Sequence, residues 1–136
     1  MWPKLDDEFL KPFPKQGGDS VLLPDNTTEA EAWKECIDKI LEFREYGDDW
    51  DGQGAEAIAP EVADSAMILA ILLRERKVRP PTWTVPGFCG EVSFDWQWHD
   101  QTTLTLDVAK PYEANLVLLP TGGEGRRWVI RQPVSV

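Results

Sequence analysis

The second half of the chain carries the feature that most restricts its fold, an alternation of apolar and polar residues with a period of two. In Glu91 to Trp98, every second side chain is Val, Phe or Trp, and the residues between them are polar. This alternation is typical of a β-strand that buries only one face. Four such segments follow one another with short turns between them, and they cover residues 91–98, 103–108, 116–119 and 127–131. A run of this kind predicts an antiparallel meander.

Two segments before these strands have the spacing of helices. The first begins at Thr28, which forms an S/T-x-x-E capping box with Glu31, and we expect Gly47 to end it. The second begins at Pro60, a residue suited to a first helical turn, and extends to about Lys77. This second helix is apolar nearly all round, so it is either buried between layers or completed by another chain.

Together these elements predict one α+β domain over residues 28–136, with two helices packed on one face of a roughly four-stranded antiparallel meander. A length of 136 residues suits a single core. Residues 1–27 contain six prolines and glycines, and we expect an irregular Pro-rich N-terminal arm there, with a short strand at residues 21–23. The arm either packs over the core or reaches a partner.

A net charge of −10 narrows the classes of partner. Nucleic acid and anionic membranes are disfavoured because both carry phosphate charge that binds clustered Lys and Arg. Strong negative charge steers a protein toward basic surfaces, although it also occurs in proteins that are simply acidic. Residues 1–60 contain 15 of the 24 acidic residues and only 6 of the 14 basic ones.

The first residues do not have the order of a signal peptide, so we expect a cytoplasmic protein.

Much of this acidity falls on one face of the first helix and on the loop that follows. Spacings of three and four residues place the helical carboxylates opposite Trp33, Ile37 and Ile40. An ordinary solvated face is the alternative, since Lys34 and Lys39 supply i,i+4 partners. The candidate partner-binding residues are Glu31, Glu35, Asp38, Glu42, Glu45, Asp48, Asp49 and Asp51.

No motif for a cofactor, a metal or a catalytic centre stands out. The Asp-rich segment from Tyr46 to Ala55 lacks the closing Glu of a calcium loop, so we expect a structural loop in which Trp50 plugs into the core. His99 is the only histidine and lies in a predicted turn, and two isolated cysteines do not complete a zinc site. Of the catalytic options, only a carboxylate-bound divalent metal suits the composition.

The run Trp50-Asp51-Gly52-Gln53-Gly54-Ala55, followed by a helix that starts with proline, resembles a family of small bacterial and phage proteins with a W-D-G-x-G-A core. In that family a proline-containing loop leads to a strand that ends in an acidic residue and Trp, and Asp95-Trp96 matches this element. The resemblance covers roughly residues 40–108. It implies a recurring fold and a mobile-element context, and it carries over no catalytic residue.

Three hypotheses follow for the function. The first is a non-enzymatic acidic binding protein, such as an inhibitor, an anti-defence protein or an antitoxin-like partner, that docks on a basic macromolecular surface with Trp2 or Trp83 as an aromatic anchor. The second is a structural subunit or an obligate homodimer assembled through the apolar second helix. The third is a metal-dependent hydrolase built from carboxylates.

Overall fold

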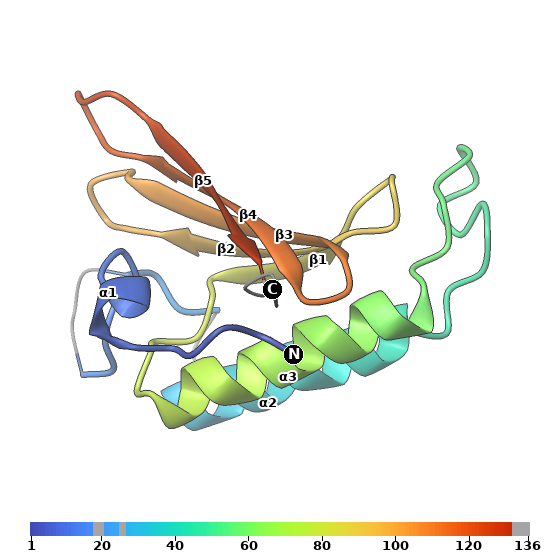
Figure 1. The fold of residues 1–136 in the computed structure, drawn as a ribbon, viewed down its shortest axis with the longest axis horizontal. Coiled ribbons are helices and arrows are strands. Elements are labelled where there is room, and N and C mark those ends of the chain that lie inside the picture. The colour runs from blue at the N-terminus through green and yellow to red at the C-terminus, as the bar shows by residue number, and fades with distance from the viewer. Residues whose placement is uncertain (18–20, 25–26, 132–136) are drawn as a thin grey trace, which may run out of the picture.

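The computed structural model describes residues 1–17, 21–24 and 27–131, and it shows a two-layer α+β fold (Figure 1). One layer is an antiparallel sheet of five strands, and the other consists of two long antiparallel helices. The helices are α1 (Asp7–Leu10), α2 (Glu29–Phe43) and α3 (Pro60–Glu75). The strands are β1 (Trp83–Pro86), β2 (Val92–Gln97), β3 (Thr103–Lys110), β4 (Glu113–Leu119) and β5 (Arg126–Arg131).

The sheet is the predicted meander, but it has five strands where the alternation predicted roughly four. Its order is β1-β2-β3-β4-β5, and every neighbouring pair is antiparallel. The strand that the prediction missed is β1, whose four residues are too few to show a period of two and which ends in Pro86. A proline in a strand is tolerated at an edge, and β1 is an edge strand.

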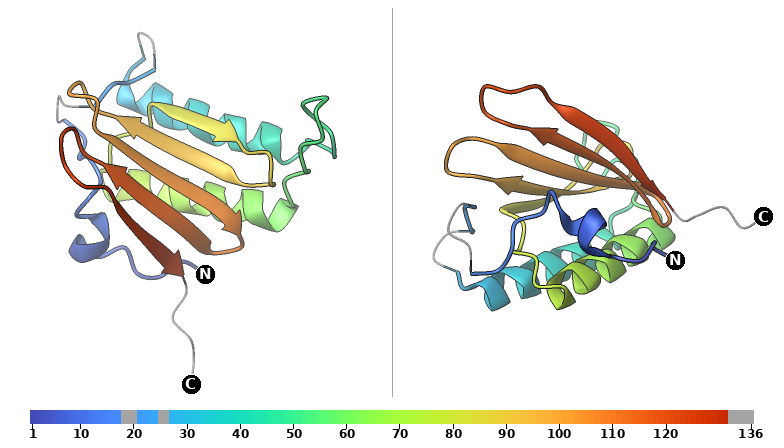
Figure 2. Two further views of the ribbon diagram at one scale, coloured as in Figure 1. Left: turned by 90° about the horizontal axis from the view of Figure 1, so that it is seen from above. Right: turned by 60° about the vertical axis from the view of Figure 1, so that its left-hand side comes forward.

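The alternating residues do place one apolar face of the sheet against the helices. Phe94 and Trp96 of β2 lie opposite Leu106 and Leu104 of β3, and all four side chains are fully buried. The two long helices do not cover the whole sheet. Helix α2 packs on β1, while α3 packs on β2 and β3, so β4 and β5 extend beyond the helical layer (Figure 2).

Helix α2 begins as predicted and ends earlier than predicted. The Thr28 hydroxyl accepts a hydrogen bond from the Glu31 amide at 3.1 Å, as expected of an N-cap. The helix ends at Phe43, and the amides of Glu45 and Tyr46 bond to carbonyls three residues back, which tightens the last turn. Gly47 therefore lies beyond the helix, and the prediction that it forms the C-cap is wrong.

Helix α3 buries its apolar side chains within the chain itself. Pro60 is at its first turn, as predicted, and Val62, Leu69 and Leu73 belong to the core. Ile68, at 38% exposure, is the only large hydrophobic residue of α3 that is exposed. Packing against α2 and the sheet thus accounts for its composition without a second chain. None of the described helices is long and apolar enough to cross a membrane.

The N-terminal arm packs over the core, which was one of the two alternatives for it. The arm contains the one-turn helix α1, and its side chains Trp2, Leu5, Leu10 and Phe13 are at most 5% exposed. The Trp2 indole donates to the Ser65 carbonyl at 2.7 Å. The prediction that Trp2 is an exposed anchor is therefore wrong. In the segment expected to hold a short strand, Val21 makes a single antiparallel bridge, with Trp98.

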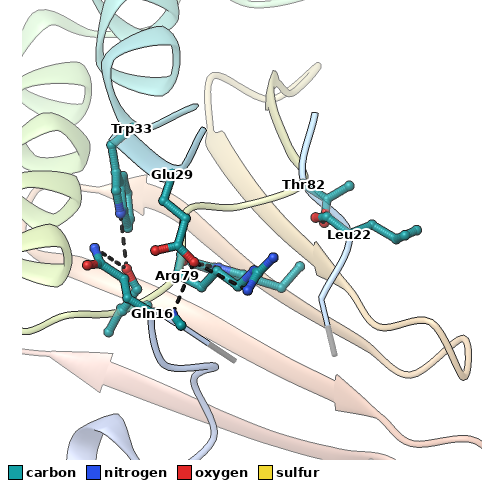
Figure 3. Close-up of polar contacts among 9 residues, drawn as sticks. Gln16, Leu22, Glu29, Trp33, Arg79 and Thr82 are labelled. Carbon is teal, nitrogen blue, oxygen red and sulfur yellow. Dashed lines mark hydrogen bonds and ion pairs between the residues drawn. The ribbon is translucent and has the colours of Figure 1, made fainter. Parts of the chain in front are cut away.

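Polar contacts tie the arm to the start of α2 and to the segment after α3 (Figure 3). Glu29 of α2 forms an ion pair with Arg79 at 3.2 Å and accepts a hydrogen bond from the Gly17 amide. The Val78 carbonyl accepts from the Trp33 indole at 3.0 Å and from the Gln16 side chain at 3.3 Å. These contacts join three segments that are far apart in the sequence.

Candidate partner-binding surface

The predicted acidic residues lie on the outer side of α2 and in the loop that follows it. Of the eight candidates, all are exposed except Asp51, which is partly buried. Glu31, Glu35, Asp38 and Glu42 belong to α2, whereas Glu45 lies in the tightened turn after the helix end. The loop extends past the ends of both long helices (Figure 1). We call α2's four outward carboxylates together with Glu45 the acidic face.

Only part of the charge on the acidic face is neutralised. Lys34 bonds to Asp38 at 2.8 Å and Lys39 lies 3.5 Å from Glu35, both as i,i+4 pairs whose side chains are more than 40% exposed. Such exposed pairs contribute little to stability. Glu31, Glu42 and Glu45 make no salt bridge with any described residue. The acidic face therefore retains net negative charge.

The three aspartates of the loop hold its backbone in place. The Gly54 amide donates to Asp49 at 2.6 Å, and the Ala57 amide donates to Asp48 at 3.0 Å. Asp51 accepts from the amides of Gln53 and Ala55 at 2.9 and 3.1 Å. The role of these carboxylates in loop structure agrees with the expectation, and their charge remains at the surface.

Trp50 does not plug this loop into the core, as the sequence suggested it would. Its side chain is partly buried outside the hydrophobic core cluster, and its ring centroid lies 5.3 Å from that of Tyr46. The indole donates to the Glu56 carbonyl at 3.0 Å, which closes the loop on itself. Trp50 thus stabilises the loop locally, and the nearest members of the hydrophobic core cluster on either side of it are Phe43 and Ile58.

Replacing Asp51 with alanine should loosen the loop. The backbone N–H of Gln53 lowers the pKa of Asp51 from 3.8. The stabilisation of the loop by the ionised Asp51 carboxylate is therefore complete above pH 3.8 and is lost as the pH falls through the lowered pKa. We expect the protection of the Gln53 and Ala55 amides, which is the slowing of their exchange relative to the intrinsic rate at the same pH, to fall several-fold in Asp51→Ala and, in the wild type, only on acidification. Asp38→Ala removes an exposed carboxylate without amide partners, so it should leave the protection of both amides unchanged. Equal protection in the two variants would contradict the role of Asp51 in holding the loop.

Three exposed apolar side chains accompany the acidic surface. Leu41 of α2 is 46% exposed and lies at the margin of the acidic face, three residues after Asp38 and four before Glu45. Trp83 of β1 is 50% exposed, as expected of an anchor, and Phe88 in the β1–β2 turn is 69% exposed. The Phe88 carbonyl accepts from the Glu56 amide at 2.9 Å, which places this turn beside the Asp-rich loop.

A groove of about 430 Å³ joins Trp83 to the acidic face. Its walls come from the arm, from α2 and from the start of β1, and its lining consists of Leu22, Leu23, Pro24, Thr27, Glu35, Lys39, Thr82 and Trp83. The Thr82 hydroxyl donates to the Leu22 carbonyl at 2.6 Å, which fixes the arm at this position. The sequence prediction missed this groove because its walls meet only through contacts some sixty residues apart.

The cysteines and the histidine do not converge. Burial raises the pKa of the Cys36 thiol to about 12, so this side chain is a neutral member of the core that accepts from the Thr84 hydroxyl. Cys89 and His99 are both exposed and lie in two different turns. Among the described residues, no group of three or more His, Cys, Asp or Glu side chains is placed to hold a metal ion.

Comparison with known proteins finds no relative: no family model, no curated protein and no solved structure matches the chain. The resemblance to the W-D-G-x-G-A family remains a prediction. What the described residues establish about Trp50 to Ala55 is its local structure, a tight loop in which Asp49, Gly52 and Gly54 have positive φ.

Proposed function

We propose that this protein is a non-enzymatic, cytoplasmic binding protein that docks its acidic face on a basic surface of a macromolecular partner. The observation that carries the proposal is the acidic face itself, on which Glu31, Glu42 and Glu45 make no salt bridge with a described residue. Leu41, 46% exposed, lies at the margin of this face, beside Asp38 and Glu45 at helical spacing. An exposed apolar side chain next to unpaired charge is typical of a protein–protein interface.

The charged and apolar parts of this surface contribute differently to binding. The carboxylates accelerate the encounter with a basic partner, while desolvation of Leu41 and Trp83 supplies affinity once the partner is docked. The groove beside Trp83 combines an aromatic ring and apolar walls with the Glu35–Lys39 ion pair, which suits an apolar or amphipathic side chain of a partner. An inhibitor, an anti-defence protein or an antitoxin-like protein acting on a nucleic-acid enzyme would use such a surface.

No specific observation favours the two other hypotheses. Helix α3 is buried by its own chain, so its composition gives no independent reason for a homodimer. A carboxylate hydrolase requires clustered acidic side chains, and the described loop aspartates are engaged with backbone amides. The homodimer and the carboxylate hydrolase therefore stay predictions.

Reversing Glu35, Asp38 and Glu42 to lysine together should slow association with a basic partner several-fold and flatten its dependence on salt. The reason is that electrostatic steering depends on the local field of the acidic face, which this variant inverts. Partners would first be captured from the organism that carries the gene, and their association rates would then be measured at two salt concentrations.

The matched control reverses Asp7, Glu75 and Glu124, three exposed carboxylates on other elements, and so changes the net charge equally. We expect the control to retain most of the association rate. Leu41→Ala should leave the association rate unchanged and speed dissociation about tenfold, as loss of a well-packed contact does. The proposal fails if both charge-reversed variants bind as the wild type does, or if both lose binding equally.

A further inference from the structure

A second hollow, on a different part of the molecule, has the opposite charge. Its volume is about 540 Å³, within the range of small-molecule sites, and it lies between α1 and the first half of β5. The arm contributes Glu8, Lys11 and Pro12, and the strand contributes Arg126, Arg127 and Trp128. None of these residues belongs to the acidic face.

The topology explains why a hollow remains here. The helical layer covers β1 to β3 and leaves the inner side of β4 and β5 to the N-terminal arm (Figure 2). The arm packs next to this space, with Phe13 against Trp96 of β2 and Trp2 against Tyr112 of the β3–β4 turn, at ring-centroid distances of 5.3 and 5.8 Å. Between α1 and the start of β5 the space stays open.

The cations around this hollow have no counter-charge in the described part of the chain. Lys11, Arg126 and Arg127 form no salt bridge with any described residue, whereas Arg44, Arg76 and Arg79 all do. The only acidic residue in the lining is Glu8, so the lining carries a net positive charge. In a protein with a net charge of −10, this concentration of unpaired cations is a local exception.

We infer that this hollow binds a small organic phosphate that carries a planar ring, with the chemistry of a nucleoside monophosphate. Arg126 of the strand and Lys11 of the facing wall suit the charge and the oxygens of a phosphate, for which Arg provides bidentate donors. Arg127 is the next residue of β5, so its side chain projects from the opposite face of the sheet. Trp128 and Pro12 provide the apolar wall for the ring. The hollow is large enough for both parts of such a molecule.

The charge of the whole protein favours a small ligand over a nucleic-acid strand. A polymer that placed one phosphate here would bring its neighbouring phosphates against a chain that carries 24 acidic and 14 basic residues. A single phosphate ester enters the basic hollow alone and does not meet that repulsion.

The test uses the full chain and adenosine monophosphate, a molecule that joins a ring to a phosphate. Titration should shift the amide NMR signals of residues 8–11 and 126–128, and calorimetry should show tighter binding than for adenosine or inorganic phosphate alone. Arg126→Ala should weaken binding about ten- to a hundredfold, the effect of losing a charge-assisted hydrogen bond. Arg127→Ala should weaken it less, because the Arg127 side chain projects from the other face of β5.

The matched control is Lys110→Ala, which removes an exposed cation near the opposite end of β5, where Glu113 pairs with Arg131. It should bind adenosine monophosphate as the wild type does. Absence of binding, shifts scattered over all lysines, or equal weakening in Lys110→Ala would overturn the inference. Equal affinity for inorganic phosphate would overturn the role of the ring.

The acidic-face variant with Glu35, Asp38 and Glu42 reversed should bind the nucleotide at least as tightly as the wild type does. Failure of one proposal can therefore be distinguished from failure of the other.

Discussion

Replacing Trp2 with alanine is expected to destabilise the protein by about 3–5 kcal/mol, the cost typical of a buried Trp→Ala substitution. Trp2 is the second residue of the chain, yet it is 5% exposed. Its indole donates to the Ser65 carbonyl at 2.7 Å, and its ring meets Tyr112 edge-on at 5.8 Å. Removing the ring therefore leaves a cavity between the arm, α3 and the β3–β4 turn and removes a buried hydrogen bond.

Trp83→Ala is the matched control, because it removes the same side chain from a site that is 50% exposed. We expect it to cost less than about 1 kcal/mol. Urea denaturation followed by circular dichroism measures both variants at once. A cost for Trp2→Ala no greater than that for Trp83→Ala would mean that the arm frays in solution and is not part of the core.

Replacing Glu29 with glutamine should cost about 2–3 kcal/mol, somewhat less than the 3–5 kcal/mol typical of a fully buried pair. The Arg79 side chain is only 13% exposed and that of Glu29 only 27%, so the arginine would lose its counter-charge in a largely desolvated place. One of its nitrogens, Nε, already lacks a hydrogen-bond partner among the described atoms. A neutral amide in place of the Glu29 carboxylate can still accept a hydrogen bond, but it cannot compensate for a buried, unpaired guanidinium.

The comparison variant is Asp38→Asn, which breaks the exposed pair with Lys34 and should cost no more than about 0.5 kcal/mol. Urea denaturation gives the free energy of unfolding of both variants. The double variant Glu29→Gln with Arg79→Met tests the mechanism, since removing both charges should restore much of the stability lost in Glu29→Gln. If the double variant is less stable than the single one by the full cost of Arg79→Met, the unpaired charge is not the cause.

Local sequence patterns determined the elements in which one face is buried. The period of two located β2 to β5 to within three residues at each end, and Thr28 and Pro60 marked the starts of α2 and α3. These predictions succeeded because burial of one face imposes a repeat along the chain. Where no repeat exists, as in the four residues of β1, prediction failed.

The same distinction applies to the candidate sites. The carboxylates of the acidic face were predictable because α2 sets their spacing, and their exposure agrees with the prediction. Neither hollow was predictable, since each is formed by segments separated by long stretches of chain: Leu22 to Pro24 with Trp83 in one, and α1 with β5 in the other. Only the packing of the arm brings these walls together.

The sequence by itself thus determined an acidic α+β chain with two long helices before a meander, because side-chain periodicity and capping act over a few residues. The tertiary structure decided that Trp2 is core and not an anchor, that the loop aspartates bond to amides, and that Arg126 lines a hollow against the arm. Those outcomes depend on contacts between distant segments, and their free energies arise only when the arm closes over the part of the sheet that the helices leave uncovered.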